Sequence, residues 1–162
     1  MKTKEIRKVL IALDYNPTAQ KVAETGFDFA KKLAAEITIL HVISNETDFA
    51  TLGYSPIMGY AGFADSDLSH LYDIEGLTRA AFHFLEKTKT HLGDETIQTL
   101  VKEGDYAKMI LETAKTRHSD IIVIGTHSRR WLENTIMGSV TEEVLRESTI
   151  PLFIIPTKKS KL

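Results

Sequence analysis

Apolar residues along this chain follow two alternating patterns: short continuous runs, and longer stretches with the three-to-four-residue period of a helix. Continuous runs are typical of strands buried on both faces of a sheet. They predict strands at about 9–13, 37–43, 121–124 and 151–155, and residues 96–101, where apolar and polar residues alternate, predict a weaker strand. The helical stretches between them start near Pro17, Leu68, Asp105 and Ser139. This alternation favours an α/β protein, an open five-stranded parallel sheet with helices on both faces.

Three of the predicted helices carry a signal at their start. Asn16 precedes Pro17, which suggests an N-cap followed by proline at the first helical position. Asp105 is the expected cap of the third helix. Ser139 and Glu142 have the spacing of a capping box, in which each side chain bonds the backbone amide of the other residue.

Residues 44 to about 66 differ from the rest of the chain, because glycine, proline and aromatic residues alternate there without a regular period. Loops of this length are uncommon in compact domains and usually carry function or stay disordered. The remaining sequence shows no internal repeat, and 162 residues suit one domain. We therefore expect a single domain over 1–162 with one long loop at about 44–66.

Composition excludes several classes of protein. The formal net charge of −2 gives no electrostatic reason to expect nucleic acid or an anionic membrane as a partner. The chain has no cysteine, which excludes disulfides, thiolate metal sites and cysteine nucleophiles. No apolar run approaches the ~20 residues of a membrane span, and the N-terminus lacks the form of a signal peptide. The expectation is a cytoplasmic protein.

The candidate chemistry follows the fourth predicted strand. Gly125 comes directly after the run at 121–124, and Gly138 precedes the helix predicted at 139–147. Glycines at a strand end and before a helix both expose backbone N–H groups, which suit an anion such as phosphate. Asp14 ends the first strand and would lie at the same edge of the sheet. Asp14 and Gly125 would face each other in strand order 3-2-1-4-5 but not in 2-1-3-4-5, and the spacing alone does not choose.

The motifs of common catalytic sites are absent from the sequence. It has no P-loop, no Gly-x-Gly-x-x-Gly and no Gly-x-Ser-x-Gly. A phospho-receiver domain would need an acidic pair beside the first strand, where Asp14 stands without one. His41 and His127 have no carboxylate partner at ligand spacing, so structural roles are expected rather than a metal pair or general base. We expect a binding protein rather than an efficient enzyme.

The ordered set of motifs resembles the universal stress protein family. The family signature, Gly-x2-Gly-x9-Gly-(Ser/Thr), is similar to Gly125-x2-Ser128-x9-Gly138-Ser139 in this chain. The first two predicted strands and the last helix and strand also resemble family segments. The resemblance covers nearly the whole chain, with 44–66 as the variable part.

The resemblance implies the 3-2-1-4-5 strand order, a homodimer through the fifth strand (Leu152 to Ile155) and bound ATP or another adenine nucleotide, with or without Mg²⁺. Asp14 and the backbone of Val42 would hold the nucleoside. The ribose and phosphates would be lined by Gly125, Ser128, Gly138, Ser139 and Val140. Arg129 and Arg130, which the signature does not include, could neutralise phosphate charge there or point to solvent. The function implied is a nucleotide-binding module in stress response or signalling, with at most slow ATP hydrolysis or self-phosphorylation. The alternative is a nucleotide-independent interaction dimer of the same fold.

Ser128 departs from the family signature, which has its second glycine at this position. If that glycine supplies a positive φ or a close approach to phosphate, the serine Cβ carries a steric cost. The serine hydroxyl could instead donate a hydrogen bond to a phosphate oxygen. The sequence leaves both outcomes open.

Overall fold

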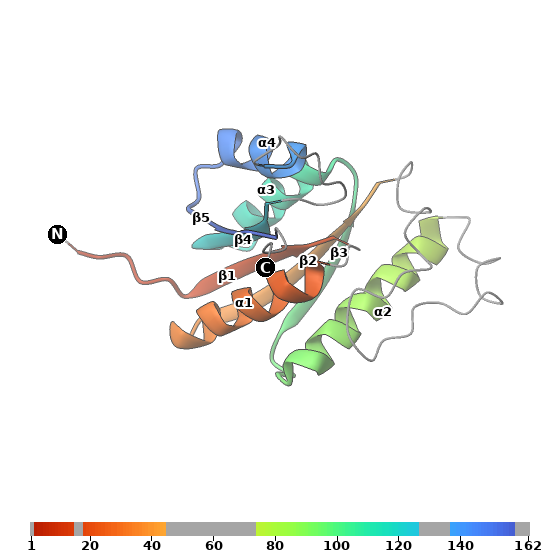
Figure 1. Ribbon diagram of the computed structural model, residues 1–162, viewed down its shortest axis with the longest axis horizontal. Coiled ribbons are helices and arrows are strands. Elements are labelled where there is room, and N and C mark those ends of the chain that lie inside the picture. The colour runs from red at the N-terminus through yellow and green to blue at the C-terminus, as the bar shows by residue number, and fades with distance from the viewer. Residues whose placement is uncertain (1, 15–17, 45–73, 127–136, 158–162) are drawn as a thin grey trace, which may run out of the picture.

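The structure is a computed structural model, and it describes residues 2–14, 18–44, 74–126 and 137–157. The elements along the chain are β1 Lys8–Leu13, α1 Ala19–Lys32, β2 Glu36–Ile43, α2 Ile74–Leu92, β3 Gln98–Glu103, α3 Tyr106–Thr116, β4 Ile121–Gly125, α4 Ser139–Glu147 and β5 Leu152–Ile155. The strands form one parallel sheet in the order β3-β2-β1-β4-β5 (Figure 1). This confirms the expected fold class and strand order. The predicted loop at 44–66 lies, apart from Ser44, outside the described residues.

The two faces of the sheet are covered by different helices. Alternate side chains of a strand point to opposite faces, and β1 follows this rule. Val9, Ile11 and Leu13 pack in one core with α1 and α2, whereas Leu10 and Ala12 pack in a second core with α3 and α4. Figure 1 shows the same division, with α1 and α2 on one side of the sheet and α3 and α4 on the other. Burial on both faces explains why the sequences of β1, after Lys8, and of β4 are continuously apolar.

The sheet opens between β1 and β4 at their carboxyl ends. The β1–β2 register runs from Lys8↔Glu36 to Leu13↔His41, whereas the β1–β4 register covers only Val9–Ile11. The helices that follow β1 and β4, α1 and α4, cover opposite faces of the sheet. This is the arrangement in which open α/β sheets form a ligand crevice.

The start of α1 corrects one prediction, and the start of α3 confirms another. α1 begins at Ala19 with Thr18 as its N-cap, two residues beyond the predicted start at Pro17. Asn16 and Pro17 themselves lie outside the described residues. Asp105 caps α3 as expected, because its carboxylate accepts a hydrogen bond from the Lys108 backbone N–H at 2.9 Å. None of the described helices has the length and apolarity needed to cross a membrane.

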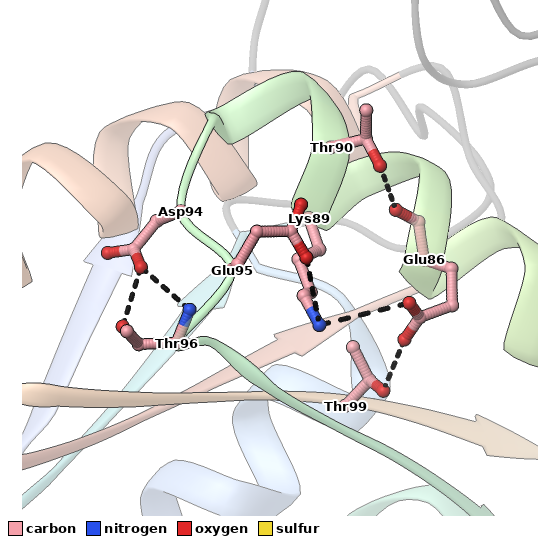
Figure 2. Close-up of polar contacts among 7 residues, drawn as sticks. All are labelled: Glu86, Lys89, Thr90, Asp94, Glu95, Thr96 and Thr99. Carbon is pink, nitrogen blue, oxygen red and sulfur yellow. Dashed lines mark hydrogen bonds and ion pairs between the residues drawn. The ribbon is translucent and has the colours of Figure 1, made fainter.

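A network of polar side chains fixes the turn between α2 and β3 (Figure 2). The Asp94 carboxylate accepts hydrogen bonds from the Thr96 backbone N–H at 2.9 Å and from its hydroxyl at 2.5 Å. Beside it, the Thr99 hydroxyl donates to Glu86 at 2.8 Å. Because these bonds to Asp94 hold Thr96 in the turn, β3 begins at Gln98 rather than at the predicted residue 96.

Asp94 gives the stability of the protein a predictable acid dependence. Hydrogen bonds from Thr96, and then from Lys31 of α1, lower the pKa of Asp94 from 3.8 to about 2. A carboxylate whose pKa is lower in the folded state stabilises the fold above its unfolded pKa, and this contribution is lost as the pH falls. Between about pH 4 and about pH 2, we expect the melting temperature of the wild type to fall more steeply than that of Asp94→Asn. Thermal melts of both proteins across this range check the prediction, and parallel curves would contradict it.

Candidate functional site

A cleft lies at the carboxyl ends of β1 and β4, where the pairing of these strands has ended. It contains about 660 Å³ of unfilled space, including the part open to solvent. Strands β1, β2 and β4 and helices α1, α3 and α4 all contribute to its lining: Ala12, Leu13, Asp14, Thr18, Val22, Leu40, Val42, Tyr106, Ile110, Ile124, Gly125, Val140 and Thr141. Most of these side chains are apolar, as is usual for a small-molecule site.

The cleft brings together four residues that the sequence singled out. Asp14 follows β1 directly and is half-buried, with its Oδ2 atom out of reach of solvent. Val42 lies in β2 and is buried, Gly125 is the last residue of β4, and Val140 lies in the first turn of α4. The predicted neighbours of these residues, Gly138 and Ser139, begin α4 beside the cleft without lining it. Ser128 and Arg129 lie outside the described residues.

Backbone and side-chain bonds hold the start of α4 against the end of β4. The Gly138 N–H donates to the Thr126 carbonyl at 2.6 Å. The Thr141 side chain, which is only 2% exposed, donates from Oγ1 to the Gly125 carbonyl at 2.7 Å. The Thr126 N–H in turn donates to the Ile155 carbonyl at 3.0 Å, which ties the same point to β5. The N-terminus of α4 is therefore fixed beside the cleft.

The predicted capping box at the start of α4 is wrong. Gly138 is the N-cap, with φ −67° and ψ 158°, and Ser139 is already the first helical residue. The Gly138–Thr126 hydrogen bond fixes the residue at which the chain enters the helix, so Ser139 stands one position too late to cap it. The N-cap makes no side-chain hydrogen bond to the helix. The first backbone N–H groups of a helix have no partner within the helix and can serve an anion.

Gly125 is required by packing. A Cβ at this position would come within 2.9 Å of Val22 Cγ2 in α1 and within 2.9 Å of Thr157 Cγ2 after β5. Both neighbours are buried, with Val22 4% and Thr157 3% exposed. The sequence linked Gly125 to anion binding through exposed backbone N–H groups, and the structure adds packing as a reason for a glycine here.

The sequence analysis missed several residues of the cleft, among them Tyr106, Ile110 and Thr141. Tyr106 and Ile110 are four residues apart on α3, so they lie on the same face of that helix and both line the cleft. Thr141 lines it from α4. The helical spacing of Tyr106 and Ile110 was visible in the sequence, but the surface against which that face packs was not. The structural role expected for His41 is confirmed, because its buried ring bonds a backbone carbonyl; His127 lies outside the described residues.

The strand order, the division of the helices and the crevice at β1 and β4 define this chain as a Rossmann-like α/β protein. Residues 5–156 match the model of the universal stress protein family. The chain belongs to that family, which confirms the resemblance inferred from its motifs.

Known relatives match this chain over nearly its whole length. The chain is 27% identical over 157 residues to universal stress protein MJ0577 of Methanocaldococcus jannaschii, covering 95% of this chain and 97% of that protein. A solved structure of MJ0577 has a TM-score of 0.72 at 25% identity and covers 97% of this chain and 100% of its own.

Two further solved structures share the fold and contain nucleotides. A universal stress protein in complex with cAMP has a TM-score of 0.63 at 14% identity, covering 96% of this chain and 100% of its own. The universal stress protein from Archaeoglobus fulgidus in complex with dAMP has a TM-score of 0.52 at 15% identity, covering 93% of this chain and 98% of its own.

Proposed function

We propose that this chain binds an adenine nucleotide in the cleft between β1 and β4 and acts as a nucleotide-dependent module in stress response or signalling. The observation that carries the proposal is the composition of the cleft. An apolar wall, a carboxylate and the N-terminus of a helix meet there within one crevice. The complexes of two structural relatives with cAMP and dAMP support adenine as the base.

The nucleoside is proposed to lie at the Asp14 side of the cleft. A carboxylate would repel phosphate, whereas it accepts hydrogen bonds from the hydroxyl groups of a ribose. The side chains of Leu40, Val42 and Ile110 offer an apolar surface beside Asp14 that suits a planar base. The backbone of Val42 is proposed to hydrogen-bond the nucleoside.

The phosphates are proposed to lie at the other side, against the end of β4 and the start of α4. Backbone N–H groups and the helix dipole favour negative charge at this point. The proposed contacts are the residues that the family resemblance indicates, Gly125, Ser128, Gly138, Ser139 and Val140, together with Arg129, whose charge would neutralise phosphate. ATP is the nucleotide proposed, with Mg²⁺ accompanying its phosphates.

We further propose a homodimer formed through β5, Leu152–Ile155. This strand ends the order of the sheet, and edge strands offer unpaired backbone groups to a second chain. Its residues Leu152, Phe153 and Ile154 are only partly buried in the single chain. Sedimentation equilibrium of the purified protein tests this part of the proposal through the mass of the particle.

Calorimetric titration of nucleotide-free protein with Mg-ATP tests the binding proposal, with AMP, cAMP and GTP as comparisons. We expect adenine-selective binding with a micromolar Kd. Asp14→Ala is expected to raise the Kd about tenfold or more, because a hydrogen bond to a charged group contributes about 1.5–3 kcal/mol. Asp28→Ala is the matched control, since it removes the same charge from the exposed face of α1.

Two results would contradict this proposal at different levels. A folded, nucleotide-free wild type that binds none of the four nucleotides would overturn the function and favour the nucleotide-independent interaction protein. Equal weakening by Asp14→Ala and Asp28→Ala would leave the function in place and remove Asp14 from the site.

A further inference from the structure

His41 is a buried ionisable residue that the proposed function does not use. Its side chain is 4% exposed, and its Nδ1 atom lies 2.8 Å from the carbonyl oxygen of Leu13. A carbonyl oxygen only accepts hydrogen bonds, so Nδ1 carries the hydrogen in this contact. The imidazole therefore donates a hydrogen bond from β2 to the last residue of β1.

The Leu13 carbonyl lies where the sheet opens. Pairing of β1 with β4 ends at Ile11, while pairing with β2 continues to Leu13↔His41. This carbonyl also belongs to the planar peptide group that joins Leu13 to Asp14. A bond that fixes its oxygen fixes that plane, and with it the direction in which the Asp14 side chain leaves the backbone.

The imidazole ring is itself held in place. Phe84 of α2, whose side chain is fully buried, meets it edge-to-face, with ring centroids 5.6 Å apart and an interplanar angle of 82°. This is a favourable geometry for an aromatic pair. The ring is thus fixed between β1 and α2, while the backbone of His41 continues directly into Val42.

We infer that His41 is a positioning residue for the nucleotide site: its imidazole orients the Leu13–Asp14 peptide so that the Asp14 carboxylate and Val42 face the same ligand. The inference rests on the proposed function. A histidine that only fills space would be replaceable by an apolar ring of similar size. A positioning histidine needs a donor at the place of Nδ1.

Three substitutions separate these roles. His41→Phe keeps an aromatic ring and removes the donor. His41→Asn places an amide nitrogen near the position of Nδ1, whereas His41→Gln places its amide one bond further out. With Mg-ATP as the probe, we expect Phe and Gln to raise the Kd about tenfold and Asn to stay within about threefold of the wild type, where tenfold corresponds to 1.4 kcal/mol.

The backbone amide of Asp14 gives a second readout that needs no nucleotide. Its N–H belongs to the same peptide group as the Leu13 carbonyl, so its ¹H–¹⁵N resonance is expected to shift in His41→Phe and His41→Gln and to stay near the wild-type position in His41→Asn. Urea unfolding of each variant shows which of them fold. If His41→Phe does not fold, the comparison of Asn with Gln decides.

Three outcomes would overturn the inference. The first is a folded His41→Phe protein that binds Mg-ATP as tightly as the wild type. The second is an equal loss of affinity in all three variants without rescue by Asn, which would show that the ring acts through packing. If the wild type binds no nucleotide, only the proposed function fails. In that case, an Asp14 resonance that stays at its wild-type position in folded His41→Phe and His41→Gln would overturn the positioning role.

Discussion

Replacing Gly138 with aspartate is expected to weaken ATP binding by about 100-fold while leaving the fold as stable as the wild type or more so. Gly138 is the N-cap of α4 with an extended backbone, φ −67° and ψ 158°, which any residue adopts. Aspartate is a better N-cap than glycine because its carboxylate accepts from the first amides of the helix. The same carboxylate would occupy the proposed phosphate position and repel the ligand, and two like charges 4 Å apart cost about 4 kcal/mol near a protein surface.

Gly138→Asn is the matched control, because it has the shape and capping ability of aspartate without the charge. Calorimetry with Mg-ATP and urea unfolding are measured on both variants. The expected pattern is a similar gain in stability for the two and a much larger loss of affinity for aspartate. An aspartate variant that binds like the asparagine variant would place the phosphates away from α4.

Gly125→Ala is expected to destabilise the protein by about 1–3 kcal/mol, the usual cost of an added methyl group in a packed core. Its Cβ would lie 2.9 Å from Val22 Cγ2 and 2.9 Å from Thr157 Cγ2, closer than real Cβ contacts come. Neither side chain can move away easily. Val22 lies in α1 and is part of the buried core between α1 and the sheet, and the Thr157 N–H donates to the Thr126 hydroxyl at 3.1 Å.

A double-mutant cycle with Thr157→Ser tests this explanation. Serine removes the clashing methyl group and keeps the hydroxyl that lies 3.1 Å from that of Thr126. In urea unfolding, we expect Thr157→Ser to lower the free energy of unfolding of the wild type. In Gly125→Ala, the same substitution is expected to restore part of the free energy of unfolding that the alanine removes. Additive effects would show that the alanine is accommodated without contact to Thr157.

Strands β1 and β4 could be predicted from their apolar runs because they are buried on both faces of the sheet, whereas β3 is half-buried or exposed along its length. The run at 121–124 could be recognised as a strand although apolar and polar residues do not alternate in it, and in the structure this strand extends only one residue further, to Gly125. The strand order depends on pairing between distant segments, which the pattern of one chain does not contain. It was obtained from the family resemblance, and the pairing of β1 with both β2 and β4 confirms it.

The errors in the prediction arise where contacts between distant segments decide the local structure. The capping box at Ser139 failed because a hydrogen bond from Gly138 to Thr126 fixes where α4 begins. Tyr106 was missed because its place in the cleft depends on how α3 lies against the sheet. The packing role of Gly125 was also missed, because the contact of α1 with the end of β4, which leaves no room for a side chain, joins distant segments.

The bond between the Gly138 N–H and the Thr126 carbonyl has a consequence for how this protein can change over time. This bond holds Thr126, directly after β4, and Gly138, the N-cap of α4, next to each other, with 2.6 Å between the nitrogen and the oxygen. Lengthening a flexible connection between fixed ends costs little, about 0.6 kcal/mol for each doubling. We therefore expect insertions and deletions between Thr126 and Gly138 to be tolerated as long as this bond is kept, without any matching change in the sheet.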